Sequence, residues 1–396
     1  MKKEQFQYDL PEERIAHEPL PERDQSLLLR YQNGVVSDHS FVELPDLLPA
    51  GSQLVCNNTR VVKARLHFTK TEGVKPIEIF CLGPHLQSVE ESMRSVGRVS
   101  FECLIGNLKR WKDHPLHLPL SNGIVLEAQR GERNGNYFVV HFHWNGPQTF
   151  AEILSEAGKI PLPPYMNREA GAEDVVRYQT VYAASEGSVA APTAGLHFTE
   201  RILEALEARG HQRLELTLHV GAGTFKPLED GDIDAHEMHS EELLLSSQWL
   251  QSYLNHKGPK FAVGTTSLRT LESTYWMGVR LLEGGPLQNL GQRDAYELPQ
   301  HYSVEKAFTA VLLALDHLGT SVHPIATQLM IKPGYRIRTV GGLVTNFHQP
   351  GSTLLLLVSA FIGERWREVY QHALKNGYRF LSYGDSSLIY LEEGKL

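Results

Sequence analysis

Apolar and polar positions follow two different periods along this chain, and the change between them predicts how the chain is organised. Between about residues 66 and 147, apolar and polar side chains alternate over short runs that Gly, Asn and Pro residues separate. Alternation with a period of two is typical of half-buried strands. Four such runs predict a small antiparallel β-barrel inserted in the chain, at residues 77–82, 99–105, 123–129 and 137–144.

From residue 149 onward, strand-like runs alternate with helical periodicity. A helical pattern over residues 199–209 precedes a strand-like run at 214–220, and a strand-like run at 261–264 precedes a helical pattern at 268–277. Such alternation predicts α/β layering. The predicted fold class is therefore α/β, with a mixed-sheet α/β main domain (residues 1–65 and 148–396) and an inserted small antiparallel β-barrel domain (residues 66–147).

Polar, glycine-spaced segments lie where the predicted elements end. Such segments occur at residues 191–198, 218–225, 236–239, 263–269 and 344–348, and four of the five contain histidine. A polar tetrad at residues 57–60 also follows a strand-like run. Loops at the ends of rigid elements are where α/β scaffolds display reactive groups. The pattern predicts an enzyme built around one polar site.

Three histidines are candidate bases. His197 precedes Thr199, a predicted helix N-cap, and a positive helix end would lower the pKa of the imidazole and keep it neutral. His219 lies on a predicted strand, and His348 follows another. For each of them a structural histidine, satisfied by a contact within the fold, is the alternative.

The glycines Gly221 and Gly223 follow the strand that carries His219. No third glycine follows them and residues 226–227 are Lys-Pro, so the sequence does not predict a dinucleotide-binding loop. Either the glycines let the backbone approach a ligand closely, with Thr224 offering a hydroxyl, or they only form a turn.

An anion site is predicted at residues 264–269. Thr265 and Thr266 link a buried strand to the helix that carries Arg269, so free N–H groups and hydroxyls lie beside a guanidinium. A carboxylate or a phosphate would fit there.

Residues 236–239 read His-Glu-Met-His, which places the two histidines three apart rather than the four apart that zinc peptidases require. No metal is therefore expected. Glu237 and His239 either supply an acid, a base or a substrate contact, or bond within their loop.

Two further segments have open alternatives. Asn346, Phe347 and His348 end a strand, and Phe347 is either a base-stacking residue or part of the core. Asp385 lies in a C-terminal loop, where it makes either a turn or a ligand contact.

Composition limits the classes of protein that remain. The net charge of −8 argues against nonspecific wrapping of nucleic acid, although clusters of Lys and Arg could still form a local basic face. The three cysteines have no metal or disulfide spacing, and residues 354–362 are too short an apolar run to cross a bilayer. A cytoplasmic protein with no membrane contact is expected.

In their order, these motifs resemble the S-adenosylmethionine:tRNA ribosyltransferase-isomerase family of queuosine biosynthesis. The resemblance runs nearly end to end and includes residues 8–11, 57–60, 177–183, 191–198, 218–225, 236–241, 263–272, 333–335, 345–348 and 378–385.

The resemblance implies that the ribosyl part of S-adenosylmethionine moves to 7-aminomethyl-7-deazaguanine at the wobble position of tRNA, giving epoxyqueuosine, adenine and methionine. In the family's usual mechanism a base removes a proton from the ribose C5′ beside the sulfonium, adenine leaves, the amine attacks, and methionine departs. S-adenosylmethionine is then a co-substrate, no prosthetic group is needed, and a monomer is expected.

Within this frame, the candidate residues are assigned as hypotheses. The catalytic candidates are His197, His219, His348, Glu237 and Asp385. The substrate-binding candidates are Arg60, Thr193, Gly195, Gly221, Gly223, Thr224, His239, Thr265, Thr266, Arg269, Asn346 and Phe347.

The sequence departs from the family pattern in several places. Asn58 stands where the family has Asp, Ser386-Ser387 replaces Ala-Met after Gly384-Asp385, and residues 284–325 look like an insertion with an additional helix at 304–317. These departures leave a noncatalytic or substrate-altered RNA-binding paralogue as one alternative. A hydrolase of a nucleoside-like substrate is another, although no metal or nucleophile spacing supports it.

Overall fold

The computed structural model describes residues 1–68, 75–112, 114–221, 223 and 231–391. Its main feature is a nine-stranded mixed sheet in the order β16-β14-β13-β3-β15-β17-β18-β1-β2. These strands are β1 (Leu27–Gln32), β2 (Val35–Ser40), β3 (Gln53–Asn57), β13 (Gln212–His219), β14 (Glu241–Ser246), β15 (Lys260–Val263), β16 (Val322–Thr327), β17 (Gly342–Asn346) and β18 (Ser386–Tyr390).

The centre of this sheet consists of four neighbouring parallel strands, β13, β3, β15 and β17. Their side chains alternate between two apolar layers: Leu54 and Cys56 enter one core cluster and Val55 the other. Alternation follows from the period of two along a strand, so each strand is apolar on both faces. Parallel pairing also brings the carboxyl ends of all four strands to the same edge of the sheet.

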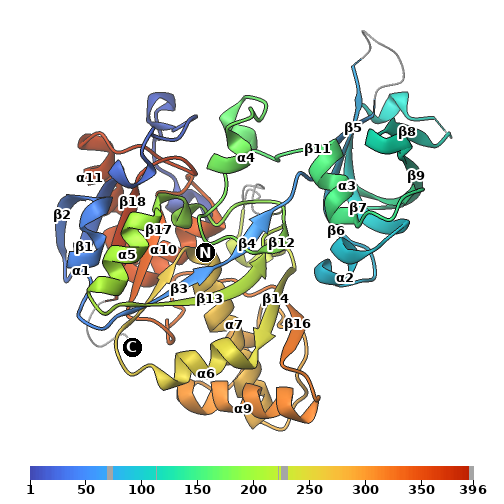
Figure 1. Cartoon of the computed structure of the whole chain (residues 1–396). Helices are drawn as coiled ribbons and strands as arrows, with labels where there is room; N and C mark the ends of the chain where they lie inside the picture. Colours follow the sequence, from blue (N-terminus) through green and yellow to red (C-terminus); the bar gives the residue numbers. More distant parts are fainter. Residues whose placement is uncertain (69–74, 113, 222, 224–230, 392–396) are drawn as a thin grey trace.

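Helices cover both faces of the sheet (Figure 1). The core cluster on one face includes side chains from α6 (Ser247–Asn255), α7 (Thr265–Leu282), α9 (Val304–His317), α10 (Thr353–Ile362) and α11 (Trp366–Lys375). The cluster on the other face includes side chains from α1 (Leu44–Leu47) and α5 (Glu200–Ala208). The result is the layered α/β arrangement that the sequence predicts.

A second sheet of seven antiparallel strands lies to one side of the main sheet as a curled half-barrel (Figure 1). Its order is β11-β5-β6-β7-β10-β9-β8, with β11 and β8 at its ends. The strands are β5 (Arg65–Phe68), β6 (Ile77–Pro84), β7 (Arg98–Gly106), β8 (Leu116–Pro119), β9 (Val125–Asn134), β10 (Tyr137–Trp144) and β11 (Gly158–Lys159). The helices α2 (Val89–Arg94) and α3 (Phe150–Ala157) accompany it.

Most predicted elements occur where the pattern places them. The four alternating runs are β6, β7, β9 and β10, and the helix predicted at residues 304–317 is α9. The prediction missed β5, β8 and β11, which are only two to four residues long. Runs this short contain too few side chains for an alternation to be recognised.

The remaining elements connect the two sheets and the helical layers. β4 (Thr59–Val61) pairs with β12 (Ser185–Ser188) in a small parallel sheet, and α4 (Asp174–Arg177) and α8 (Asp294–Glu297) are single turns. Among the described residues no helix is long and apolar enough to span a membrane.

A fully buried carboxylate joins α7 to the segment that leads into β17. Glu272 accepts hydrogen bonds from the hydroxyl of Tyr335 at 2.6 Å, the backbone N–H of Arg338 at 2.9 Å, and the backbone N–H and hydroxyl of Thr339 at 2.8 and 2.7 Å. Burial raises the pKa of Glu272, and the four donors partly offset that cost. This contact fixes the relative position of two elements that build the site described below.

We expect Glu272→Ala to lower the free energy of unfolding by about 3 kcal/mol, because the substitution leaves several buried donors without an acceptor. Urea denaturation measures the change. Glu207→Ala, on the exposed side of α5, is the matched control and should change stability by less than about 0.5 kcal/mol. Equal stability of both variants would show that the Glu272 contacts do not hold α7 in place.

Candidate functional site

A cavity of about 180 Å³ lies where the parallel strands β13, β15 and β17 end. Ligand sites of open α/β sheets form at this edge, outside the carboxyl ends of the strands. Apolar side chains such as Leu329, Ile331 and Leu357 line part of the cavity. Its polar lining includes Thr193, Glu241, Thr265, Thr266, Arg269, Asn346 and His348. Phe347 lines it too, so the structure brings together seven residues that the sequence assigns to the site, together with Glu241.

The amino end of α7 faces this cavity. Gly264 joins β15 to the helix with φ of 88°, a left-handed conformation that favours glycine. The N–H groups of the first turn have no partner within a helix, and the helix dipole makes this end positive. The Thr266 hydroxyl oxygen is buried and has no hydrogen-bond partner among the described residues. Gly264, Thr265, Thr266 and Arg269, from the segment predicted to bind an anion, thus lie in the cavity wall, and anion binding stays a prediction.

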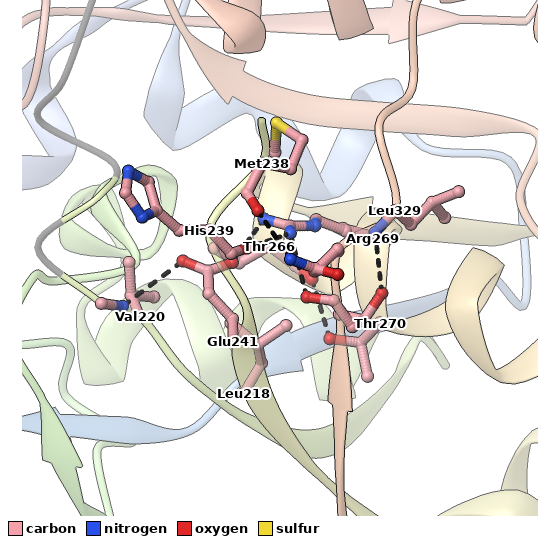
Figure 2. Close-up of polar contacts among 12 residues, drawn as sticks. Leu218, Val220, Met238, His239, Glu241, Thr266, Arg269, Thr270 and Leu329 are labelled. Carbon is pink, nitrogen blue, oxygen red and sulfur yellow. Dashed lines mark hydrogen bonds and ion pairs between the residues drawn. The ribbon is translucent and has the colours of Figure 1, made fainter. Parts of the chain in front are cut away.

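Arg269 lies one turn further along α7 and is held from several sides (Figure 2). One terminal nitrogen donates to the carboxylate of Glu241, and the other lies 3.3 Å from the carbonyl oxygens of His239 and Thr327. The Nε atom is buried without a partner among the described residues. Arg269 therefore has a fixed orientation and one donor left over.

Glu241 is the functional candidate that the sequence analysis missed. It begins β14, is only 5% exposed, and also accepts from the backbone N–H of Gly221 at 3.3 Å. Leu243 and Leu245 follow it on the same buried face of the strand. The sequence contained a signal for Glu241: it alternates with Leu243 and Leu245 on the buried face of the strand. A buried carboxylate requires a partner, so such a position marks a candidate for the site.

Asn346 connects the cavity to His197 behind it. The Thr193 hydroxyl donates to Asn346 Oδ1 at 3.1 Å, and Asn346 Nδ2 lies 3.2 Å from Nε2 of His197. Because the amide nitrogen can only donate, Nε2 accepts and Nδ1 carries the proton, which points to the Ser26 hydroxyl 2.8 Å away. His197 does not line the main cavity; it lines a small neighbouring one.

His219 and His348 lie on different sides of the edge. His348 lines the main cavity, and its Nε2 lies 2.9 Å from the hydroxyl of Thr345. His219 contacts the hydroxyl of Thr59 at 3.1 Å and lines another cavity, between the main sheet and the half-barrel. Of the three candidate bases, only His348 therefore faces the main cavity.

All three histidines are neutral at physiological pH. Burial lowers the pKa of His197 and of His348 to about 3 and that of His219 to about 4. For His197 the positive charge of Arg379 contributes after burial. The neutral imidazole predicted for His197 is present, but burial rather than a helix end is its main cause.

Phe347 has no exposed surface. Its ring packs against those of Tyr370, Tyr378 and Phe380, with centroids 5.4, 5.6 and 4.9 Å away. This environment favours the core alternative for Phe347, and a base-stacking role stays a prediction.

The other candidates lie outside the lining of the main cavity. Asp385 accepts from the backbone N–H groups of Leu27 at 3.0 Å and Arg379 at 2.7 Å, as a buried structural carboxylate would. Glu237 is exposed, and Arg60 donates to the carbonyl of Ala183 at 2.7 Å. Their functional roles stay predictions.

Two of the three glycine candidates, Gly195 and Gly223, are close-packing positions, whereas a Cβ atom on Gly221 would meet no atom within 4 Å. A Cβ atom on Gly195 would lie 2.2 Å from the Tyr182 hydroxyl, and one on Gly223 would lie 2.1 Å from the His239 ring. Gly221 lines the cavity near His219, and Thr224 is outside the described residues. Within the described part of the chain, no group of three or more His, Cys, Asp or Glu residues is arranged to hold a metal ion.

Comparisons with known proteins cover nearly the whole chain. The sequence model of a family described as queuosine biosynthesis protein matches residues 3–389. The S-adenosylmethionine:tRNA ribosyltransferase-isomerase of Burkholderia mallei (strain SAVP1) is 38% identical over 395 residues, covering 97% of this chain and 94% of that protein. The protein of the same name from Stenotrophomonas maltophilia (strain R551-3) is 39% identical over 400 residues, covering 100% of both.

A solved structure of an S-adenosylmethionine tRNA ribosyltransferase from Thermotoga maritima is also similar. It is 24% identical, covers 97% of this chain and 99% of that chain, and has a TM-score of 0.46. The family match and the identity to the curated relatives both extend over more than nine-tenths of the sequence. The chain therefore belongs to the queuosine biosynthesis family of S-adenosylmethionine:tRNA ribosyltransferase-isomerases.

Proposed function

We propose that this protein transfers and isomerises the ribosyl moiety of S-adenosylmethionine onto 7-aminomethyl-7-deazaguanine at the wobble position of tRNA. The products are epoxyqueuosine-tRNA, adenine and methionine. Membership of the family supports the reaction, and the cavity at the carboxyl ends of the parallel strands supports its place in the fold. The three cysteines are buried free thiols, which supports the cytoplasm as its compartment.

The observation that carries the proposal is a pair of unsatisfied donors in a largely apolar cavity. Thr266 Oγ1 and Arg269 Nε are buried at the positive end of α7 and have no hydrogen-bond partner among the described residues. Buried polar groups are normally hydrogen-bonded, so a ligand with an anionic group is expected to complete the set. The carboxylate of the methionine part of S-adenosylmethionine meets that requirement.

Glu241 supplies the complementary charge for the same ligand. Its carboxylate is 5% exposed, lines the cavity and lies beside Arg269. An α-amino acid has a carboxylate and an ammonium group on one carbon, so adjacent Arg and Glu side chains match both charges. In this arrangement Arg269 and Thr266 bind the carboxylate and Glu241 accepts from the ammonium.

We assign proton abstraction to His348 rather than to His197 or His219. His348 alone of the three lines the main cavity, and its imidazole is neutral, so a lone pair is available to accept a proton. A base with so low a pKa is weak, and the adjacent sulfonium must provide most of the acidity of the ribose C5′ proton. His197 then acts as a positioning residue that holds Asn346.

The replacement of Asp by Asn at position 58 does not favour a noncatalytic paralogue. Asn58 lies outside the lining of the cavity; its Oδ1 accepts from the Thr217 hydroxyl at 2.7 Å and its Nδ2 donates to Glu215 at 3.2 Å. A carboxylate at this position would repel Glu215. The Asn side chain thus fits its contacts with Thr217 and Glu215, and the change does not alter a residue that lines the cavity.

We also propose that the half-barrel is an inserted domain; the bounds predicted from the sequence, residues 66–147, then extend to residues 65–159, because α3 and β11 belong to it. Its buried cluster includes Phe80, Phe101, Phe142 and Trp144 and is separate from the clusters on either side of the main sheet. A separate apolar core is the property expected of a domain.

Replacing Thr266 by Val is expected to weaken S-adenosylmethionine binding about tenfold without loss of stability, because the hydroxyl has no hydrogen-bond partner within the described part of the chain. The KM for S-adenosylmethionine and the thermal midpoint measure the two effects. Thr274→Val is the matched control. Thr274 lies about two turns after Thr266 on the same helix, outside the lining of the cavity, and its hydroxyl donates to the carbonyl of Thr270. The same KM for both variants would remove Thr266 from the binding site.

Replacing His348 by Gln is expected to lower kcat for adenine release by at least about 100-fold while tRNA affinity is retained, since the proton acceptor is lost. His219→Gln, with its side chain outside the main cavity, should keep kcat within a few-fold of wild type. Unchanged turnover of the His348 variant would contradict the assignment.

The pH profile of the wild-type protein tests the same assignment. With a pKa of about 3, His348 stays neutral from pH 8 down to about pH 4. Its protonation should therefore cause no fall in kcat/KM between pH 8 and pH 5. An acid limb near pH 6.5 that disappears in His348→Gln would show that the imidazole titrates normally.

A further inference from the structure

A second, smaller cavity of about 20 Å³ lies behind the wall of the main one, and three arginines line it. They are Arg23, Arg177 and Arg379, which come from distant parts of the chain. Ser382 lines both cavities, and His197 lines the smaller one while contacting Asn346 of the larger. The two cavities therefore adjoin each other at Ser382 and at the contact between His197 and Asn346.

Two of these guanidinium groups are held by neutral groups rather than by carboxylates. Arg177 donates to the carbonyl oxygens of Leu20 and of Pro21, the latter at 2.9 Å, and Arg23 donates to the carbonyl of Gln179 at 2.9 Å. Such contacts orient a guanidinium without neutralising its charge. The Nε atom of Arg177 is buried and has no hydrogen-bond partner among the described residues.

The nearby carboxylates are already engaged. Asp385 contacts Arg379 at 3.4 Å and also accepts from two backbone N–H groups. Asp24 adjoins Arg23 in sequence, but it accepts from the Thr199 hydroxyl at 2.7 Å and pairs with Arg201 at 2.9 Å. A net positive charge therefore remains in the small cavity, although the chain as a whole has a net charge of −8.

Electrostatic effects on two lining residues agree with this conclusion. The pKa of Arg23 is lowered by burial and then by the charge of Arg177. The pKa of His197 is lowered by burial and then by the charge of Arg379. Mutual repulsion among fixed cations is the arrangement that an incoming anion relieves.

We propose that Arg23, Arg177 and Arg379 bind a backbone phosphate of the RNA substrate, next to the nucleotide whose base enters the main cavity. This inference rests on the proposed function. An enzyme that acts on one base must hold that nucleotide out of its stack, and phosphate contacts fix its position. Guanidinium groups suit this task because their planar donors match phosphate oxygens.

The surface beside Arg177 fits an RNA partner better than a free anion. Val176 and Val175, on the same turn of helix, are 68% and 42% exposed, and Val181 is 39% exposed. Exposed apolar side chains next to a phosphate site offer contact to an unstacked base. A free phosphate ion would make no use of them.

The test is the binding of an anticodon stem–loop RNA to the full-length protein as a function of salt. Arg23→Gln should weaken binding about tenfold and reduce the slope of log K against log salt by about 0.7, because one phosphate contact is lost. Arg23→Lys should retain the slope, since it keeps the charge. S-adenosylmethionine affinity should be unchanged in both.

Arg177→Gln should behave as Arg23→Gln does, and its thermal midpoint checks that the lost contacts to Leu20 and Pro21 leave the fold intact. Arg94→Gln is the matched control: Arg94 is 76% exposed on α2 and pairs with Glu90, away from both cavities. It should keep the affinity and the slope of wild type.

Equal RNA affinity and equal salt slope in wild type, Arg23→Gln and Arg177→Gln would overturn the phosphate site. A second outcome would also overturn it: inorganic phosphate binds the wild-type protein but not these variants, while the RNA affinity of the variants stays normal. The arginines would then hold a small anion only. A wild-type protein that binds no stem–loop would contradict the proposed function itself, and this inference with it.

Discussion

The parallel register of β13, β3, β15 and β17 is the constraint on which the rest of the structure depends. Their apolar side chains alternate between two covered faces, so a shift of one residue would exchange the packing of every side chain in a strand. The same register brings their carboxyl ends, and the polar segments that follow them, to one edge. Segments far apart in the chain become one site because the core fixes where each strand ends.

Burial determines the electrostatics of that site. Histidines 197, 219 and 348 are neutral because charging them inside the fold is costly, whereas Arg269 forms an ion pair with Glu241. Thr266 Oγ1 and Arg269 Nε, which have no hydrogen-bond partner among the residues that the structure describes, are held by the fold before any ligand arrives. Donors oriented in advance in a largely apolar cavity are the arrangement that favours tight and specific binding of a charged substrate.

Much of the fold could be predicted from the sequence, because long periodic segments encode their own secondary structure. α9, β6, β7, β9 and β10 occur where their apolar periods place them. The site was harder to predict. The end of a strand can be located in the sequence, but the direction in which its last side chains point cannot. His197, His219 and His348 look alike in the sequence, yet only His348 faces the main cavity, and Glu241 was missed because its partner Arg269 is 28 residues away.

The measurement that tests the account most directly is incubation of the purified protein with S-adenosylmethionine and tRNA carrying 7-aminomethyl-7-deazaguanine. Adenine release and the mass of the modified nucleoside are followed together. If the protein carries out the proposed reaction, one adenine is released for each ribosyl group transferred to the tRNA. Binding of tRNA without any adenine release would contradict it, and would show that a site with this geometry has lost the chemistry or acts on another substrate.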